Sequence, residues 1–124
     1  MSKNILIVDD ASAIRKVVAL ALNEAGYNVH EAVDGLDALD KLKSTNVDLM
    51  ICDVNMPKMD GIEFLDKIKN DEEYSSYRFP PIIMLTTEAG SDMKAKGKEL
   101  GAKAWLVKPF KPEELIGAVG KLMI

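Results

Sequence analysis

The chain has a single cysteine, Cys52, among its 124 residues. Without a second thiol it can form neither an internal disulfide nor a metal site built from several cysteines, and we expect Cys52 to be a reduced residue of the core. Prolines and glycines are also few, five and eight respectively, whereas 48% of the residues are apolar and 29% are charged. This composition excludes collagen-like and disordered chains and is typical of a globular protein with a substantial core.

Long apolar runs are missing too. The longest has six residues, 17–22, whereas a membrane-spanning helix needs about 20. No secretory signal is recognisable at the amino terminus, because a strand-like segment follows the first four residues. The sequence therefore predicts a cytoplasmic protein with no membrane partner. Its length suits one domain, so we expect a single domain over residues 1–124 and no separate output domain.

Basic residues are not in surplus, since the chain carries 16 basic and 20 acidic side chains. Nucleic acid is therefore not an expected partner. The charges are unevenly distributed, with a net charge of −7 over residues 1–88 and +3 over residues 89–124. The last third is either an ordinary solvated face or a mildly basic surface for an acidic partner protein.

Apolar residues gather in short runs that predict strands. Four runs without alternation predict strands buried on both faces, and they lie at residues 5–8, 49–52, 82–85 and 104–107. A fifth, weaker strand is expected at 28–32. Helical periodicity between the runs predicts helices over 14–22, over 36–42, from Asp60 onward, over 92–100 and from Pro112 onward. This alternation predicts an α/β fold, a (βα)5 doubly wound parallel sheet of the flavodoxin-like type with strand order 2-1-3-4-5.

The helices carry further signals. Gly26 is expected to end the first helix, and the residues expected to cap helices are Ser12, Asp34 and Asp60. The positions expected to face the core are Ile14, Val17, Val18, Ala21 and Leu22 in the first helix, Leu36, Leu39 and Leu42 in the second, and Leu115, Val119, Leu122 and Met123 in the last. Gly117 and Gly120 interrupt the last helix at a cost of ~1 kcal/mol each relative to alanine, which fits either close packing or an adaptable helix.

Polar residues stand where the predicted strands end. Asp9 and Asp10 follow the first strand, Asp53 the third, Thr86 the fourth and Lys108 the fifth. In an open α/β sheet the functional crevice lies at the carboxyl ends of the strands. Because the first and third strands are neighbours in the expected order, three carboxylates should converge there and repel one another unless a cation joins them.

Magnesium is the expected cation, because it prefers oxygen ligands and retains several waters. We expect Asp10 and Asp53 to bind Mg²⁺ directly and Asp9 to act through a water molecule. The loop after Asp53 can add a backbone carbonyl, that of Asn55. With Mg²⁺ bound and Lys108 nearby, the formal charges of the site sum to zero, so the site can accept an incoming anion.

A carboxylate beside a divalent cation, an ammonium group and a hydroxyl is suited to attack phosphorus. Asp53 ends a buried strand and is the expected nucleophile, which would become an aspartyl phosphate. Lys108 would neutralise the phosphoryl oxygens, and Thr86 would donate its hydroxyl to one of them.

Four motifs together resemble a known family. They are Ile7-Val-Asp-Asp10, Asp53-Val-Asn-Met-Pro57 followed by Met59-Asp-Gly61, Leu85-Thr86, and Lys108-Pro-Phe110. In this order and at these strand ends they are similar to the motif set of response-regulator receiver domains, and above all to the stand-alone chemotaxis regulators of that family. The resemblance covers the whole chain.

The resemblance implies a two-component phosphoacceptor switch. Asp53 would take the phosphoryl group from the phosphohistidine of a sensor kinase of the CheA type. Thr86 and Trp105 would be the switch pair, although Trp105 stands where the family usually has tyrosine, which affects the identity of the output partner. Asn55 and Glu88 match the positions that tune hydrolysis of the acyl phosphate. Only self-phosphorylation and self-dephosphorylation are expected, with no turnover of an external substrate.

Output would then come from the surface of the domain itself. We expect a monomer that binds a flagellar motor switch protein, or another output protein, through the last strand and the helices beside it. A phosphorelay intermediate or a phosphate sink would need the same residues.

Two other classes remain as alternatives. A haloacid-dehalogenase-type phosphatase also uses Asp, Mg²⁺, Thr and Lys, but it places an Asp-x-Asp pattern after the first strand, where this chain has Asp9-Asp10-Ala11. A flavodoxin-like electron carrier needs a hydroxyl- and glycine-rich phosphate loop at that place, and the two aspartates would repel the flavin phosphate.

Overall fold

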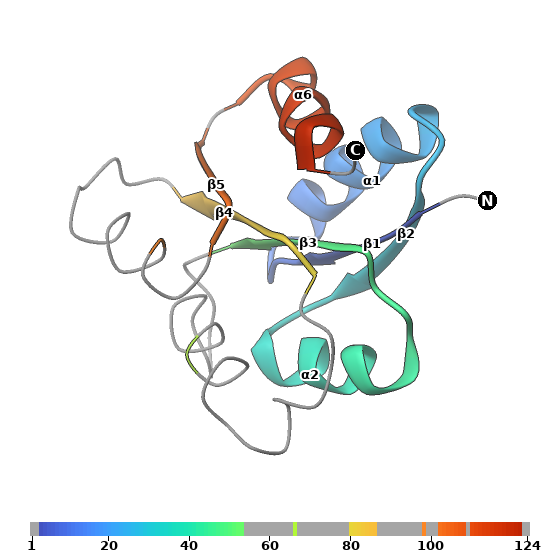
Figure 1. The fold of residues 1–124 in the computed structure, drawn as a ribbon. Coiled ribbons are helices and arrows are strands. Elements are labelled where there is room, and N and C mark those ends of the chain that lie inside the picture. The colour runs from blue at the N-terminus through green and yellow to red at the C-terminus, as the bar shows by residue number, and fades with distance from the viewer. Residues whose placement is uncertain are drawn as a thin grey trace.

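A computed structural model describes residues 3–53, 66, 80–86, 98, 102–108 and 110–122. Within these ranges the strands are β1 (Asn4–Val8), β2 (Asn28–Ala32), β3 (Leu49–Asp53), β4 (Ile82–Thr86) and β5 (Ala104–Val107). The helices are α1 (Ser12–Glu24), α2 (Gly35–Ser44) and α6 (Pro112–Leu122) (Figure 1). Of the expected helices from Asp60 onward and over 92–100, the described residues include only Asp66 and Lys98, both of which are helical, and the rest lies outside them.

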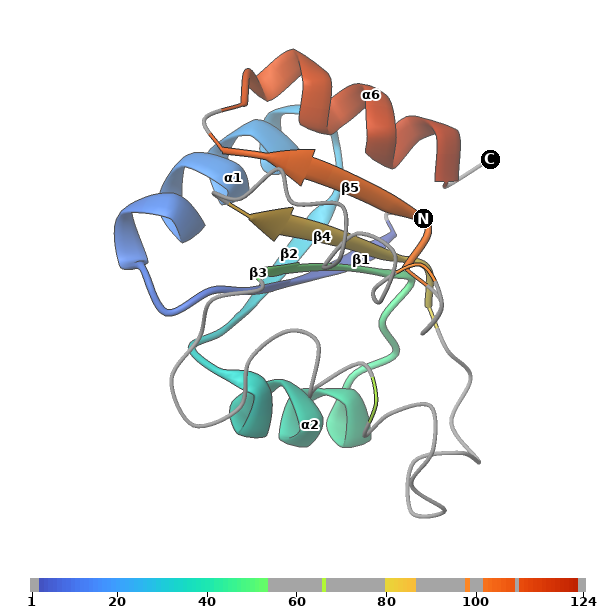
Figure 2. The ribbon, with the colours of Figure 1, turned by 90° about the vertical axis from the view of Figure 1, so that its left-hand side faces the viewer.

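The five strands form one parallel sheet in the order β2-β1-β3-β4-β5, which confirms the predicted topology. Helices α1 and α6 cover one face of this sheet and α2 lies against the other, as the side view shows (Figure 2). Strands β1, β3 and β4 are central and therefore covered on both faces, which explains their unbroken apolar sequences. None of the helices in the described part of the chain is long and apolar enough to cross a membrane.

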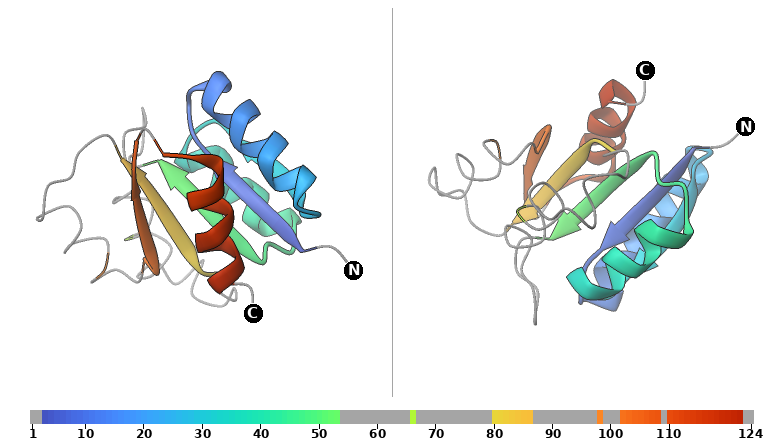
Figure 3. Two further views of the ribbon diagram at one scale, coloured as in Figure 1. Left: turned by 90° about the horizontal axis from the view of Figure 1, so that it is seen from above. Right: turned by 60° about the horizontal axis from the view of Figure 1, so that its bottom comes forward.

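Side chains alternate along each strand and so divide the core into two layers. In β1, Ile5 and Ile7 join Val18 of α1 and Val119 of α6 on one face. The layer on the other face, toward α2, comprises Leu6, Val8, Ala32, Ala38, Leu39, Met50, Cys52, Ile82 and Met84. Cys52 is buried, as expected. Views from above and below show α1 and α6 lying across one face and α2 across the other (Figure 3).

Strand β5 is less buried than its sequence predicts. Its first three residues are half-buried, and Val107 is 37% exposed. The reason is topological, because β5 pairs only with β4 and forms an edge of the sheet, whereas β3 and β4 are buried at every position. The expectation of burial on both faces is therefore wrong for β5.

Two expected core positions are also wrong. Val17 in α1 is 57% exposed and Leu36 in the first turn of α2 is 48% exposed, although Val18 and Leu22 of α1 are fully buried. A helix that lies on one sheet face buries only a narrow stripe, and neighbours of that stripe remain in solvent even when they are apolar.

The starts of α1 and α2 differ in how they are capped. Asp34 caps α2 as predicted, because its carboxylate accepts a 2.8 Å hydrogen bond from the Asp37 amide. Ser12, by contrast, is the first residue of α1 and not its cap. The cap position is Ala11, which has no capping side chain. Instead, the Asp9 carboxylate accepts the Ala11 amide at 2.9 Å. The capping prediction for Ser12 is therefore wrong.

Gly26 ends α1 as predicted, with a backbone φ of +96° that disfavours other residues. The Gly26 amide donates to the Asn23 carbonyl, and the next amide, of Tyr27, donates to the Leu22 carbonyl, both at 3.1 Å. This pair of hydrogen bonds is the Schellman motif, which satisfies carbonyls that the helix leaves open.

Gly117 and Gly120 lie inside α6 without such a reason. No described atom is within 4 Å of a Cβ built at either position, so close packing does not explain them. The sequence leaves two explanations open, close packing and an adaptable helix. The space that the described residues leave around both positions agrees with an adaptable helix.

We expect Gly117→Ala and Gly120→Ala each to raise the free energy of unfolding by about 0.5–1 kcal/mol, because alanine restricts the unfolded chain and favours the helix. Gly26→Ala should lower it by about 1–2 kcal/mol, because alanine is strained at positive φ. Urea unfolding followed by far-UV circular dichroism measures all three. A destabilised Gly117→Ala would mean that a neighbour occupies the space beside α6.

Candidate functional site

Three carboxylates meet where β1 and β3 end. Asp9 and Asp10 directly follow β1 and Asp53 is the last residue of β3, and these strands pair side by side. One oxygen from each carboxylate lies within 4.8 Å of those of the other two. Asp9 and Asp53 are buried, whereas Asp10 is exposed. The predicted convergence of the three residues is therefore present.

Lys108 brings a positive charge to this cluster. Its ammonium Nζ lies 3.3 Å from Asp9 Oδ2 and 3.1 Å from Asp53 Oδ2. Lys108 follows β5, so its side chain reaches past the end of β4 to the ends of β3 and β1. Its backbone is fixed by a 2.7 Å hydrogen bond from its amide to the Thr86 carbonyl.

The site holds an excess of negative charge that suits a divalent cation. Three carboxylates and one ammonium carry a formal charge of −2, and two of the carboxylates are removed from water. Oxygens that share an Mg²⁺ ion at about 2.1 Å lie about 3–4 Å apart, and the carboxylate oxygens here all lie within 4.8 Å of one another. The donor set is all oxygen, as Mg²⁺ prefers. The residues present therefore fit this ion.

Thr86 and Trp105 lie on neighbouring strands but not directly opposite each other. Thr86 ends β4, is fully buried and pairs in register with Val107, while Trp105 pairs with Met84. Side chains two residues apart on a strand share a face, so Thr86 and Trp105 lie diagonally on the face that α2 covers. Trp105 is half-buried and packs against the core layer of that face.

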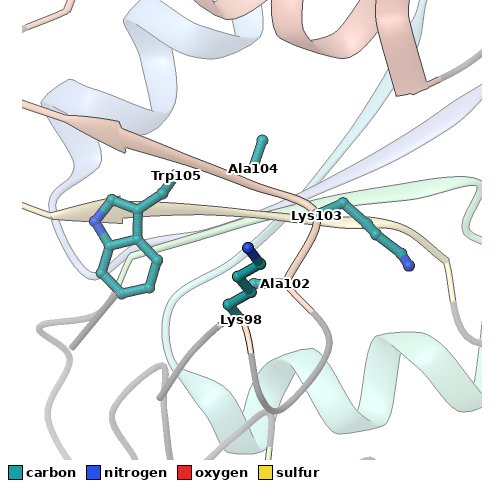
Figure 4. Close-up of a pocket in the computed structure, with 5 residues that line it drawn as sticks. All are labelled: Lys98, Ala102, Lys103, Ala104 and Trp105. Carbon is teal, nitrogen blue, oxygen red and sulfur yellow. The ribbon is translucent and has the colours of Figure 1, made fainter. Parts of the chain in front are cut away.

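A pocket of about 290 Å³ lies beside the indole ring of Trp105. Its described lining residues are Lys98, Ala102, Lys103, Ala104 and Trp105. The indole ring and the Lys98 side chain lie on the same side of β5, and Ala104 points to the other side (Figure 4). The indole Nε1 is buried and has no hydrogen-bond partner within the described part of the chain. This edge of the sheet thus combines an aromatic surface with two basic residues.

Two predicted site residues, Asn55 and Glu88, lie outside the described residues.

Arg15, which lies beside the site, was not singled out from the sequence. Arg15 of α1 donates from Nη1 to the Asp9 carbonyl at 2.6 Å and from Nε to Glu31 Oε1 at 3.0 Å. A signal was available, because Arg15 is the fourth residue of α1, and the start of a helix disfavours basic side chains.

Comparison with known proteins identifies one family. The family model for the response regulator receiver domain matches residues 5–120. Protein PilG of Pseudomonas aeruginosa is 37% identical over 115 residues, which are 93% of this chain and 83% of PilG. Chemotaxis protein CheY-3 of Vibrio cholerae is 41% identical over 113 residues, which are 89% of this chain and 85% of CheY-3. The solved structure of CheY4 of Vibrio cholerae is similar with a TM-score of 0.88 and 43% identity, covering 98% of this chain and 99% of that one.

The charge balance of the site predicts opposite effects for two substitutions in Mg²⁺-free buffer. Lys108→Met should lower the free energy of unfolding by about 2 kcal/mol, because it leaves Asp9 and Asp53 buried without their cation. Asp10→Asn should raise it by about 1 kcal/mol, because one of three repelling charges is removed. Urea unfolding checks both, with Lys111→Met, an exposed lysine, as the matched control. Equal stability of Lys108→Met and Lys111→Met would show that the ion pairs contribute nothing.

Proposed function

The chain belongs to the response regulator receiver domain family, and we propose that it is a phosphorylation switch whose phosphoacceptor is Asp53. Receiver domains belong to two-component systems, interact with kinases and output proteins, and generally bind Mg²⁺. The observation that carries the proposal is the convergence of Asp9, Asp10 and Asp53 around the ammonium group of Lys108.

Asp53 is the best nucleophile of the three carboxylates. It ends a strand that is buried along its whole length, so its backbone is held rigidly. In the proposed transfer a carboxylate oxygen of Asp53 attacks the phosphorus of a phosphohistidine. The new O–P bond forms as the N–P bond breaks, and the released imidazole nitrogen takes up a proton. The product is an aspartyl phosphate.

The other residues of the site stabilise charge during this transfer. Lys108 already touches Asp53, so a small movement of its ammonium group brings it to a phosphoryl oxygen. Asp10 and Asp53 would hold Mg²⁺ directly and Asp9 would hold it through water. When bound, Mg²⁺ neutralises charge on the phosphoryl oxygens. The buried hydroxyl of Thr86 would donate to one of those oxygens.

The output surface is proposed to be the edge of the sheet at β5. Lys98, Lys103 and the pocket beside Trp105 suit a partner that carries acidic and apolar side chains. The similarity to a chemotaxis protein and to PilG favours a partner in motility, such as a motor switch protein, with a CheA-type kinase as phosphodonor. A phosphorelay or phosphate-sink role would use the same phosphoacceptor site.

We expect acetyl phosphate with Mg²⁺ to attach one phosphoryl group per chain, on Asp53. Asp53→Asn should abolish labelling because it removes the nucleophile, and omission of Mg²⁺ should do the same. Asp40→Asn, on the exposed side of α2, is the control and should be labelled like wild type. Intact-protein mass spectrometry measures the stoichiometry. Labelling of Asp53→Asn at the wild-type level would overturn the assignment.

The proposed switch gives an optical signal because Trp105 is the only tryptophan. An acyl phosphate carries more negative charge than the carboxylate and should draw the Thr86 hydroxyl inward. Trp105 should then turn into the vacated space and bury indole surface worth ~25 cal/mol per Å².

Phosphorylation should therefore shift tryptophan emission to shorter wavelength and reduce quenching by iodide. Thr86→Ala should be labelled but should show neither change, while Thr45→Ala, a remote control at the end of α2, should behave like wild type. An identical spectrum before and after labelling of wild type would mean that Trp105 does not move.

A further inference from the structure

Asp9 and Asp10 are adjacent in sequence but are held very differently. Every polar group of Asp9 is bonded: its amide donates to the Ala32 carbonyl at 3.1 Å, its carbonyl accepts from Arg15, and its two carboxylate oxygens accept from the Ala11 amide and from Lys108. Asp10 is exposed, and no hydrogen bond or ion pair to another described residue holds its carboxylate. The backbone that precedes Asp10 must therefore set its position.

Arg15 is attached to that backbone. Its Nη1 donates to the carbonyl of the peptide group that joins Asp9 to Asp10, at 2.6 Å. Its Nε donates to Glu31 Oε1 at 3.0 Å, and the Arg15 side chain is only 14% exposed although Glu31 is 45% exposed. The guanidinium group thus connects the turn after β1 to α1 and to β2, which lies next to β1 in the sheet.

The backbone of Glu31 is held by two contacts. Glu31 pairs in register with Ile7 of β1, and its backbone carbonyl accepts a 3.0 Å hydrogen bond from Lys41 Nζ of α2. The Asp9–Asp10 peptide is consequently connected to helices on both faces of the sheet. Arg15 connects it directly to α1, and Glu31 of β2 connects Arg15 to Lys41 of α2.

We propose that Arg15 is a positioning residue for the metal site, which holds the Asp9–Asp10 peptide so that the Asp10 carboxylate faces Asp53. The inference rests on the proposed function, because it concerns the Mg²⁺ that the three carboxylates would hold. Arg15 itself touches neither the metal nor the phosphoryl group.

Positioning and simple electrostatics predict opposite effects of removing Arg15. By charge alone, removing a cation beside an acidic cluster leaves the cluster more negative, so that it should bind Mg²⁺ more tightly. Loss of a brace that orients a ligand weakens binding, and residues that support metal ligands typically contribute about 10–100-fold in affinity. The sign of the change therefore separates the two roles.

The experiment is a calorimetric titration of Mg²⁺ into four proteins: wild type, Arg15→Met, Lys16→Met and Arg15→Lys. Arg15→Met should bind Mg²⁺ about 10-fold more weakly than wild type. Lys16→Met removes the same charge from the next, exposed residue and should bind as tightly as wild type or slightly more tightly. Arg15→Lys keeps the charge but loses the planar fork, so its affinity should fall between those of wild type and Arg15→Met.

Urea unfolding in Mg²⁺-free buffer shows whether each variant is folded at the titration temperature. Unchanged or tighter binding by folded Arg15→Met overturns the positioning role and leaves the proposed metal site intact. Should Arg15→Met not fold, Arg15→Lys decides, and wild-type affinity in that variant overturns the inference. If wild type itself binds no Mg²⁺, the proposed metal site and the role of Arg15 are both wrong.

Discussion

The mutual repulsion of three carboxylates is the constraint on which the rest of this structure depends. A parallel sheet with β1 beside β3 cannot avoid bringing the residues after these strands together, and here they are Asp9, Asp10 and Asp53. Burial of two of them makes the repulsion stronger than it would be in water. The remaining features of this edge of the sheet can be understood as compensation, in which Lys108 supplies charge and backbone amides supply hydrogen bonds.

Compensation by Lys108 also connects parts of the chain that are far apart. Lys108 and Asp9 are separated by 99 positions, and their contact joins the ends of β5 and β1 across β3 and β4. The same ammonium group touches Asp53, so any new charge on Asp53 changes the balance that Lys108 experiences. The Lys108 amide is also bonded to the Thr86 carbonyl. Asp53 at the end of β3, Lys108 after β5 and Thr86 at the end of β4 are therefore joined by a short series of contacts.

Much of the fold could be predicted from the sequence because the central strands, which are buried on both faces, are short unbroken apolar runs separated by segments of helical periodicity. The strand order and the convergence of the acidic residues followed from this. The burial of individual side chains could not be predicted in the same way. Exposure depends on which neighbours cover a side chain, as Val17, Leu36 and the residues of β5 show. Arg15 was missed for a related reason. Its two partners lie six and 16 residues away, one just after β1 and the other on β2, so local sequence does not identify them, although a basic residue at the start of a helix was a signal that Arg15 has a partner.

The buried Nε1 of Trp105 has an energetic consequence for the edge of the sheet. A buried donor without an acceptor costs about 1–3 kcal/mol, so the indole gains less from its packing than its apolar area implies. An orientation of the indole that gives Nε1 an acceptor would remove this cost. In the proposed switch Trp105 is the residue that responds, and an acceptor carried by a partner would complete its hydrogen bond and settle the indole in one orientation.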